Sequence, residues 1–310
     1  MKNLSSGLFV TVLFAAMLFS PKAVFNGASE GLLLWYEIIF PTLFPFLVVT
    51  SLLLAAGGLR FIAGLTGRFL CSFFCVSPNG SFAVLAGFLC GYPMGAKITA
   101  DLLRSGRISQ EEGSYLLSFC NNTSPVFILN FIVWKTFGRE DLMLPTLLIL
   151  MGVPILLSFL FRRIYLRGRT CFSDLPDDSA GKTKRFSFSV FDSCMMDSFE
   201  SIVKVGGYII LFSVLLELIR ELPGDNALMP WAAPTLEVTN GIRMLGENIS
   251  DFRIAYPAVL ALTSFGGFCS IAQTQCMLEG TGLKIIPYII EKLAAAAAAS
   301  LLAVLYLKFF

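Results

Sequence analysis

Long apolar runs dominate the hydrophobic pattern of the chain, and short segments rich in polar residues, Gly or Pro separate them. A bilayer core of about 30 Å needs about 20 apolar residues of helix. Runs near this length predict six transmembrane helices, at residues 4–19, 32–56, 113–133, 142–161, 199–218 and 285–307. The pattern is therefore typical of an all-α polytopic membrane protein.

Two further apolar stretches contain a turn before either could cross a bilayer. Residues 81–108 carry Gly91-Tyr92-Pro93-Met94-Gly95 in the middle, and each arm covers only about half of the hydrocarbon thickness. Residues 258–282 show the same arrangement around Gly266 and Gly267. We predict two re-entrant hairpins. Irregular backbone inside a bilayer is tolerated only where protein or a wet cavity covers it, so the turns are expected to line a binding site.

Three other segments depart from regular spans. The span 113–133 contains Cys120-Asn121-Asn122-Thr123-Ser124-Pro125, a polar run that predicts a discontinuous helix facing the protein interior. Pro41 and Pro45 predict a kink in the span 32–56. Residues 59–75 and 231–246 are predicted to be short interfacial segments.

The order of these elements predicts an inverted repeat. Residues 1–30 form an N-terminal helix, residues 31–161 and 194–310 form the two repeats, and residues 162–193 connect them. Aligning Gly91 with Gly267 superposes the two hairpins, and an odd number of crossings separates the repeats. Inverted repeats with paired broken elements are the sequence signature of secondary transporters.

Charge and composition narrow the class of protein. The 32-residue connection 162–193 carries seven Lys and Arg residues, which predicts that this loop and both termini are cytoplasmic. A cleaved signal peptide at residues 4–19 is the alternative to a retained first helix. The hydrophobic content of 56% and mean hydropathy of +0.76 indicate a lipid bilayer as the main partner. The net charge of +2 argues against nucleic acid as a partner.

The absence of histidine excludes His-ligated metals and Ser-His or Cys-His catalysis. Eight cysteines without a CxxC pair are expected to be small buried residues. No cofactor and no enzymatic activity are therefore expected.

Three motifs carry a resemblance to a known family: Gly91-Tyr92-Pro93-Met94-Gly95-Ala96-Lys97, Cys120-Asn121-Asn122-Thr123-Ser124-Pro125 and Leu236-Glu237-Val238-Thr239-Asn240-Gly241. With them the chain resembles the sporulation integral membrane proteins of the YlbJ type. These belong to the nucleoside-recognition (Gate) domain group, which is similar in layout to concentrative nucleoside transporters. The resemblance implies a transporter that moves dipicolinate across the mother-cell-derived outer forespore membrane.

A site for this flat dianion needs positive charge or converging donors. Lys97, beside the first turn, and the helix N-termini after each break are the candidates, although an ion pair between Lys97 and Asp101 is the alternative. The predicted substrate-binding residues are Gly91, Tyr92, Gly95, Lys97, Asn121, Asn122, Thr123, Ser124, Gly267, Ser270, Gln273 and Gln275. For the Asn and Thr side chains, hydrogen bonding between helices is an open alternative.

Four acidic residues are candidates for coupling to Na⁺ or H⁺: Glu37, Glu200, Glu237 and Glu291. Other functions stay open beside dipicolinate transport. A nucleoside transporter would use groups such as Glu237 and Gln273 against ribose hydroxyls, and a membrane scaffold for spore assembly would use the central loop. A homo-oligomer is also compatible with the pattern.

Overall fold

The computed structural model describes residues 2–56, 58, 67–167, 171–172, 187–221 and 229–309. Over this part the chain is helical and contains no strand, as the apolar pattern predicted. Six helical segments of the described part are long and apolar enough to cross a bilayer: Pro21–Ala55, Gln110–Phe137, Glu140–Leu166, Phe188–Arg220, Phe252–Met277 and Ile285–Phe309. The protein is therefore an all-α polytopic membrane protein.

The structure has six candidate spans, the number predicted from the sequence, but one of the six is a different segment. Within α1 (Lys2–Phe19), the stretch Val10–Phe19 qualifies only as a shorter apolar helix. The sixth span is instead Phe252–Met277, which contains most of the predicted second hairpin.

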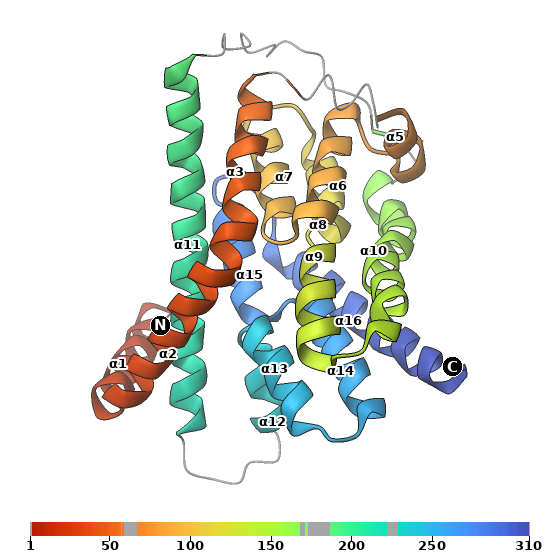
Figure 1. Ribbon diagram of the computed structural model, residues 1–310. Coiled ribbons are helices and arrows are strands. Elements are labelled where there is room, and N and C mark those ends of the chain that lie inside the picture. Colours follow the sequence, from red (N-terminus) through yellow and green to blue (C-terminus); the bar gives the residue numbers. More distant parts are fainter. Residues whose placement is uncertain are drawn as a thin grey trace.

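The first span bends where proline was expected to disturb it. Helix α2 (Pro21–Leu34) passes through the π-helical segment η1 (Trp35–Ile39) into α3 (Phe40–Ala55) (Figure 1). Pro41 has no backbone donor, and its ring would clash with the carbonyl four residues earlier. The wider π turn just before Pro41 relieves this conflict.

A helical hairpin follows the short helix α5 (Arg68–Phe74). Its arms are α6 (Pro78–Cys90) and α7 (Met94–Arg104), which pack side by side (Figure 1). The Ser77 hydroxyl caps α6 by accepting from Gly80 N at 3.0 Å. Gly91, with φ +86°, ends the first arm in a conformation that favours glycine.

The next span is interrupted inside its polar run. Helix α8 (Gln110–Cys120) ends before four non-helical residues, and the chain resumes as α9 (Pro125–Phe127) and the π-helical η3 (Ile128–Phe137). The Ser124 hydroxyl caps the second part by accepting from Phe127 N. After the short η4 (Glu140–Leu142), α10 (Met143–Leu166) returns to the other face. We call residues 121–124 the first break.

The hairpin packs on this break at unusually short range. A Cβ atom added to Gly87 would lie 2.0 Å from the carbonyl oxygen of Cys120, and one added to Gly95 would lie 2.4 Å from it. Only glycine leaves room for this approach. The Cys120 carbonyl is therefore held between the two arms of the hairpin.

The second half begins with α11 (Phe188–Arg220), which spans the molecule (Figure 1). Helix α12 (Met229–Ala232) and the 3₁₀ turn η5 (Ala233–Thr235) then reverse into α13 (Val238–Asn248). Gly241 of α13 lies so close to η5 that an added Cβ would be 2.0 Å from the Pro234 carbonyl oxygen. The predicted interfacial segment 231–246 is thus a second short hairpin.

The prediction of a re-entrant hairpin at residues 258–282 is wrong, because the chain continues in the same direction through this segment. Helix α14 (Phe252–Phe265) leads through Gly266 into α15 (Gly267–Met277) as one interrupted span. Gly266 and Gly267, with φ +86° and +78°, break the helix without reversing it. We call Gly266 the second break. Helix α16 (Ile285–Phe309) completes the chain.

Each half therefore has the order span, hairpin, interrupted span, span. The hairpin α6–α7 corresponds to η5–α13, and the first break to the second, so Gly91 and Gly267 are not equivalent positions. The two hairpins enter from opposite faces of the molecule (Figure 1). We call the face that carries the ends of α3, α7 and α10 the loop face, and the other the far face.

The predicted placement of both termini with the central loop does not hold for the C-terminus. Three spans follow the connection between α10 and α11, namely α11, α14–α15 and α16. An odd number of crossings puts Phe309 on the far face, opposite the end of α10.

Candidate functional site

A cavity of about 320 Å³ lies between the two halves, where their hairpins and breaks meet. Its walls come from η1, α3, the end of α6 and the turn after it, the first break, α9, η3, α11, the second hairpin and α15. Most of the lining is apolar. The polar and charged residues that line it are Thr42, Tyr92, Thr123, Ser124, Asn130, Lys135, Glu237, Thr239, Ser270 and Gln273.

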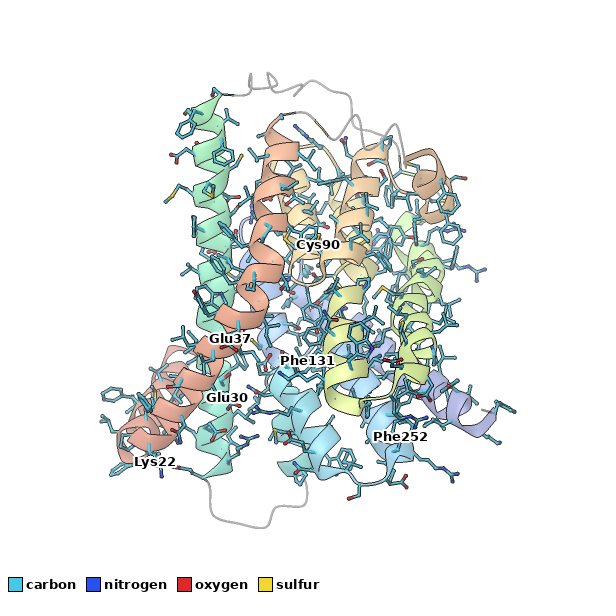
Figure 2. All side chains as sticks on the ribbon, viewed as in Figure 1. Lys22, Glu30, Glu37, Cys90, Phe131 and Phe252 are labelled. Atoms are coloured by element: carbon cyan, nitrogen blue, oxygen red, sulfur yellow. The ribbon has the colours of Figure 1, made fainter. Side chains whose placement is uncertain are left out.

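Two lining residues of this cavity are labelled in Figure 2. Its lining residues Cys90 and Phe131 lie in the centre of the view, with Cys90 nearer the loop face. A cavity at this depth, built from non-helical backbone of both halves, is the geometry in which transporters hold a solute.

Contacts between the halves assemble the site. The ring of Tyr92, in the first hairpin, comes within 3.5 Å of where a Cβ on Gly266 would lie. Thr123 Oγ1 donates to the Thr263 carbonyl oxygen at 3.3 Å, which joins the first break to α14. Within the second half, Cys269 N donates to the Leu236 carbonyl oxygen at 2.9 Å and holds the turn of the second hairpin.

Tyr92 has the most distinctive polar atom of the cavity. Its hydroxyl is buried and Thr123 is beside it, yet no hydrogen bond of normal geometry joins it to a described residue. A buried hydroxyl without a partner costs about 1–3 kcal/mol. Tyr92 itself lines the cavity.

Glu237 is the carboxylate of the cavity, and its position has a local cause. It caps α13, with Oε1 accepting from Thr239 N at 3.1 Å and Oε2 accepting from Asn240 N at 2.8 Å. The side chain is buried, with only 3% of the residue exposed. Both oxygens are thus committed to the backbone of the second hairpin.

Half of the predicted substrate-binding residues line the cavity. These are Gly91, Tyr92, Thr123, Ser124, Ser270 and Gln273. The other half lie elsewhere: Gly95, Lys97, Asn121, Asn122, Gly267 and Gln275. Among these, the Gln275 side chain is exposed, and Gly267 supports the turn of the second hairpin.

Lys97 is not on the cavity wall. Its Nζ pairs with Asp101 Oδ2 at 3.2 Å and with Asp197 Oδ2 at 3.0 Å, and the residue is 5% exposed. A separate cavity of about 330 Å³ at the loop face is lined by both aspartates. The alternative reading of Lys97, an ion pair with Asp101, describes its contacts in the structure.

Asn121 and Asn122 hold the first break in place. Asn121 Oδ1 accepts from Ala96 N at 3.3 Å, and its Nδ2 donates to Thr274 Oγ1 and Tyr288 OH, both at 2.9 Å. Asn122 accepts from Lys292. These bonds connect helices, which was the open alternative for the asparagines.

The predicted coupling residues are dispersed. Glu237 lines the cavity, whereas Glu37 is exposed on the outer segment η1 (Figure 2). Glu200 pairs with Lys204 at 2.6 Å on the exposed side of α11. Glu291 is buried and bonds to Tyr165. Within the described part of the chain, no cluster of His, Cys, Asp or Glu residues could hold a metal ion.

Sequence reasoning missed Lys135, which is the basic residue that lines the cavity. In the sequence it looks like an ordinary charge at the end of a span. The π-helical turns of η3 carry it to the cavity, together with Asn130. Thr42 and Thr239 were also missed, although Thr239 belongs to the third of the motifs that carry the resemblance.

Comparison with known proteins gives one informative similarity. No family model matches the chain, and no solved structure matches it. The chain is 26% identical to the sporulation integral membrane protein YlbJ of Bacillus subtilis (strain 168), over an alignment of 334 positions that covers 97% of this chain and 81% of the relative. Similarity across nearly the whole length agrees with the resemblance of the three motifs. The six apolar helices make the chain a multi-pass integral membrane protein.

Proposed function

We propose that the protein transports a small organic anion, and that this anion is dipicolinate, moved across the outer forespore membrane during sporulation. The central cavity, into which both halves turn their non-helical segments, is the observation that carries the proposal. Paired broken helices that meet between inverted repeats form the solute sites of secondary transporters.

The size and lining of the cavity suit such a solute. Its volume of about 320 Å³ is at the lower end of ordinary ligand sites, which favours a molecule with one ring. Phe127 and Phe131 supply flat apolar surface, and Tyr92, Ser270 and Gln273 supply hydrogen-bonding groups. The unpartnered Tyr92 hydroxyl is the group that we expect to bond the solute directly.

The proposed membrane orientation follows from charge. The connection 162–193 carries seven Lys and Arg residues, so we place the loop face in the cytoplasm. Both hairpins are then re-entrant, the first from the cytoplasmic side and the second from the far side. Transport in place of catalysis is part of the same proposal, because Glu237 uses both oxygens as a cap and the chain has no histidine.

Uptake by purified protein in proteoliposomes tests the proposal. Labelled dipicolinate is compared with a labelled nucleoside, in wild type, in Tyr92→Phe and in Tyr36→Phe. Loss of one hydrogen bond to the solute should raise the half-saturating concentration about five- to tenfold in Tyr92→Phe. Tyr36, whose side chain is 64% exposed, is the matched control and should behave as wild type.

The outcomes separate the alternatives. If the nucleoside is transported and dipicolinate is not, the protein is still a transporter but its substrate is a nucleoside. Glu237 and Gln273 would then face the ribose of that nucleoside. If uptake of neither solute exceeds uptake by protein-free liposomes, transport of these solutes is rejected. The membrane scaffold then becomes the favoured function.

A further inference from the structure

A second cavity adjoins the central one on the side of the far face. It measures about 190 Å³ and lies between η3 and α13. Three residues line both cavities: Phe131, Lys135 and Thr239. Because α13 runs from the central turn out to the far face, the second cavity lies on the way from that face to the centre.

The junction of the two cavities carries a free positive charge. Lys135 is exposed, and its Nζ lies 5.5 Å from the centre of the Phe131 ring. No ion pair joins Lys135 to any residue that the structure describes. An unpaired ammonium at a cavity junction attracts an anion, and the low-dielectric walls strengthen this attraction.

The other charges of the second cavity are arranged around Lys135. Arg243 pairs with Glu30 and also donates to Asn240 Oδ1 at 3.4 Å, so most of its charge is compensated. Glu247 lies one turn further along α13, toward the far face. Lys135 is therefore the basic group closest to the central cavity, and the acidic group is at the outer end.

An ion pair and two hydrogen bonds connect the first hairpin to the second half at the loop face. Lys97 of the first hairpin binds Asp197 of α11, and Arg104 binds the carbonyl oxygens of Met277 and Glu279 at 2.7 and 2.8 Å. These bonds tie the hairpin to α11 and to the end of α15 at the loop face.

We infer that the second cavity is the entrance from the far face, and that Lys135 binds a carboxylate of the entering anion at its inner end. The occupant rests on the proposed function, since it is the transported solute. The preference of the entrance for anions does not depend on transport and is tested separately.

The test uses Cys90, a native thiol on the wall of the central cavity. Methanethiosulfonate reagents form a mixed disulfide with this thiolate and release methanesulfinate. An anionic and a cationic reagent of similar size are added to intact cells or to inverted membrane vesicles. Mass spectrometry then quantifies modification of the Cys90 peptide in the full-length protein.

We expect the anionic reagent to modify Cys90 faster than the cationic one, and only when added at the far face. Lys135→Met should lower the ratio of the two rates about fivefold, and Lys135→Arg should restore it. Lys22→Met removes an exposed lysine away from both cavities and should leave the ratio unchanged (Figure 2).

Two results would overturn the inference. One is modification of Cys90 only from the loop face, and the other is a rate ratio that Lys135→Met leaves unaltered. Neither result requires dipicolinate, so the entrance and the substrate assignment can fail independently. Thermal unfolding of each variant checks that the fold is retained.

Discussion

Lys292 Nζ donates to Asn122 Oδ1 at 3.0 Å, which joins α16 to the first break across 170 residues of sequence. Both residues are buried, with 2% and 6% exposed, and the ammonium also lies 5.7 Å from the centre of the Tyr288 ring. Helix α8 ends at Cys120, next to this hydrogen bond. The dipole of α8 favours a cation at its C-terminal end.

Removing only the Asn122 acceptor should lower the free energy of unfolding more than removing both Asn122 and Lys292. Asn122→Leu leaves a buried ammonium without its amide and should lower the free energy of unfolding by about 3 kcal/mol. Lys292→Met added to Asn122→Leu should recover part of the loss. Thermal unfolding in nanodiscs measures the four members of this double-mutant cycle.

The control for that cycle is Asn248→Leu, an exposed asparagine at the end of α13. Its effect should stay within about 0.5 kcal/mol. Equal stability of Asn122→Leu and the control would contradict the role of the pair.

Alanine at Gly95 should disrupt the contact between the first hairpin and the first break. The added methyl group would lie 2.4 Å from the Cys120 carbonyl oxygen, and the backbone cannot give way easily. We expect a loss of about 1–3 kcal/mol, as for other overpacked sites. Gly152→Ala in α10 meets nothing within 4 Å and should be neutral or slightly stabilising. Equal melting temperatures of the two variants would show that the contact is not tight.

The two aspartates bound to Lys97 should differ in importance. Asp197 is more than half exposed, so Asp197→Asn should cost less than about 1 kcal/mol. Asp101 is more buried and also accepts from Arg104 at 3.0 Å. Asp101→Asn therefore weakens the ion pairs with both Lys97 and Arg104 and should destabilise the protein more. Thermal unfolding at low and at high salt measures both, and a larger loss in Asp197→Asn would contradict the ranking.

Glu237 should act through the backbone and not through proton uptake. Glu237→Ala removes the cap of α13 and should destabilise the protein by about 1–2 kcal/mol. Glu237→Gln keeps one acceptor oxygen and should be milder. We expect uptake by Glu237→Gln to keep the pH profile of the wild type. A profile that becomes flat in this variant would instead assign Glu237 to coupling.

The sequence was informative where local chemistry decides the structure. The apolar runs predicted the number of spans, and Asn121 to Pro125 marked the first break, because polar groups and a proline are costly in a lipid-facing helix. Gly91 marked a turn for a similar local reason.

The sequence was uninformative where contacts with residues far along the chain determine the structure. The turn at Leu236 and Glu237 contains neither Gly nor Pro, and its reversal depends on the Glu237 cap and on the approach of Gly241 to η5. Lys97 looked like a solute ligand because its partner Asp197 is 100 residues away. Lys135 looked like a surface charge until η3 was seen to carry it to the cavity.

The position of the Cys120 carbonyl between Gly87 and Gly95 limits how the protein can change shape. Neither arm of the first hairpin can slide along α8 without driving backbone into backbone. The first hairpin and α8 must therefore move together as one rigid block in any conformational change, and this block would have to rotate against α11 and the second hairpin.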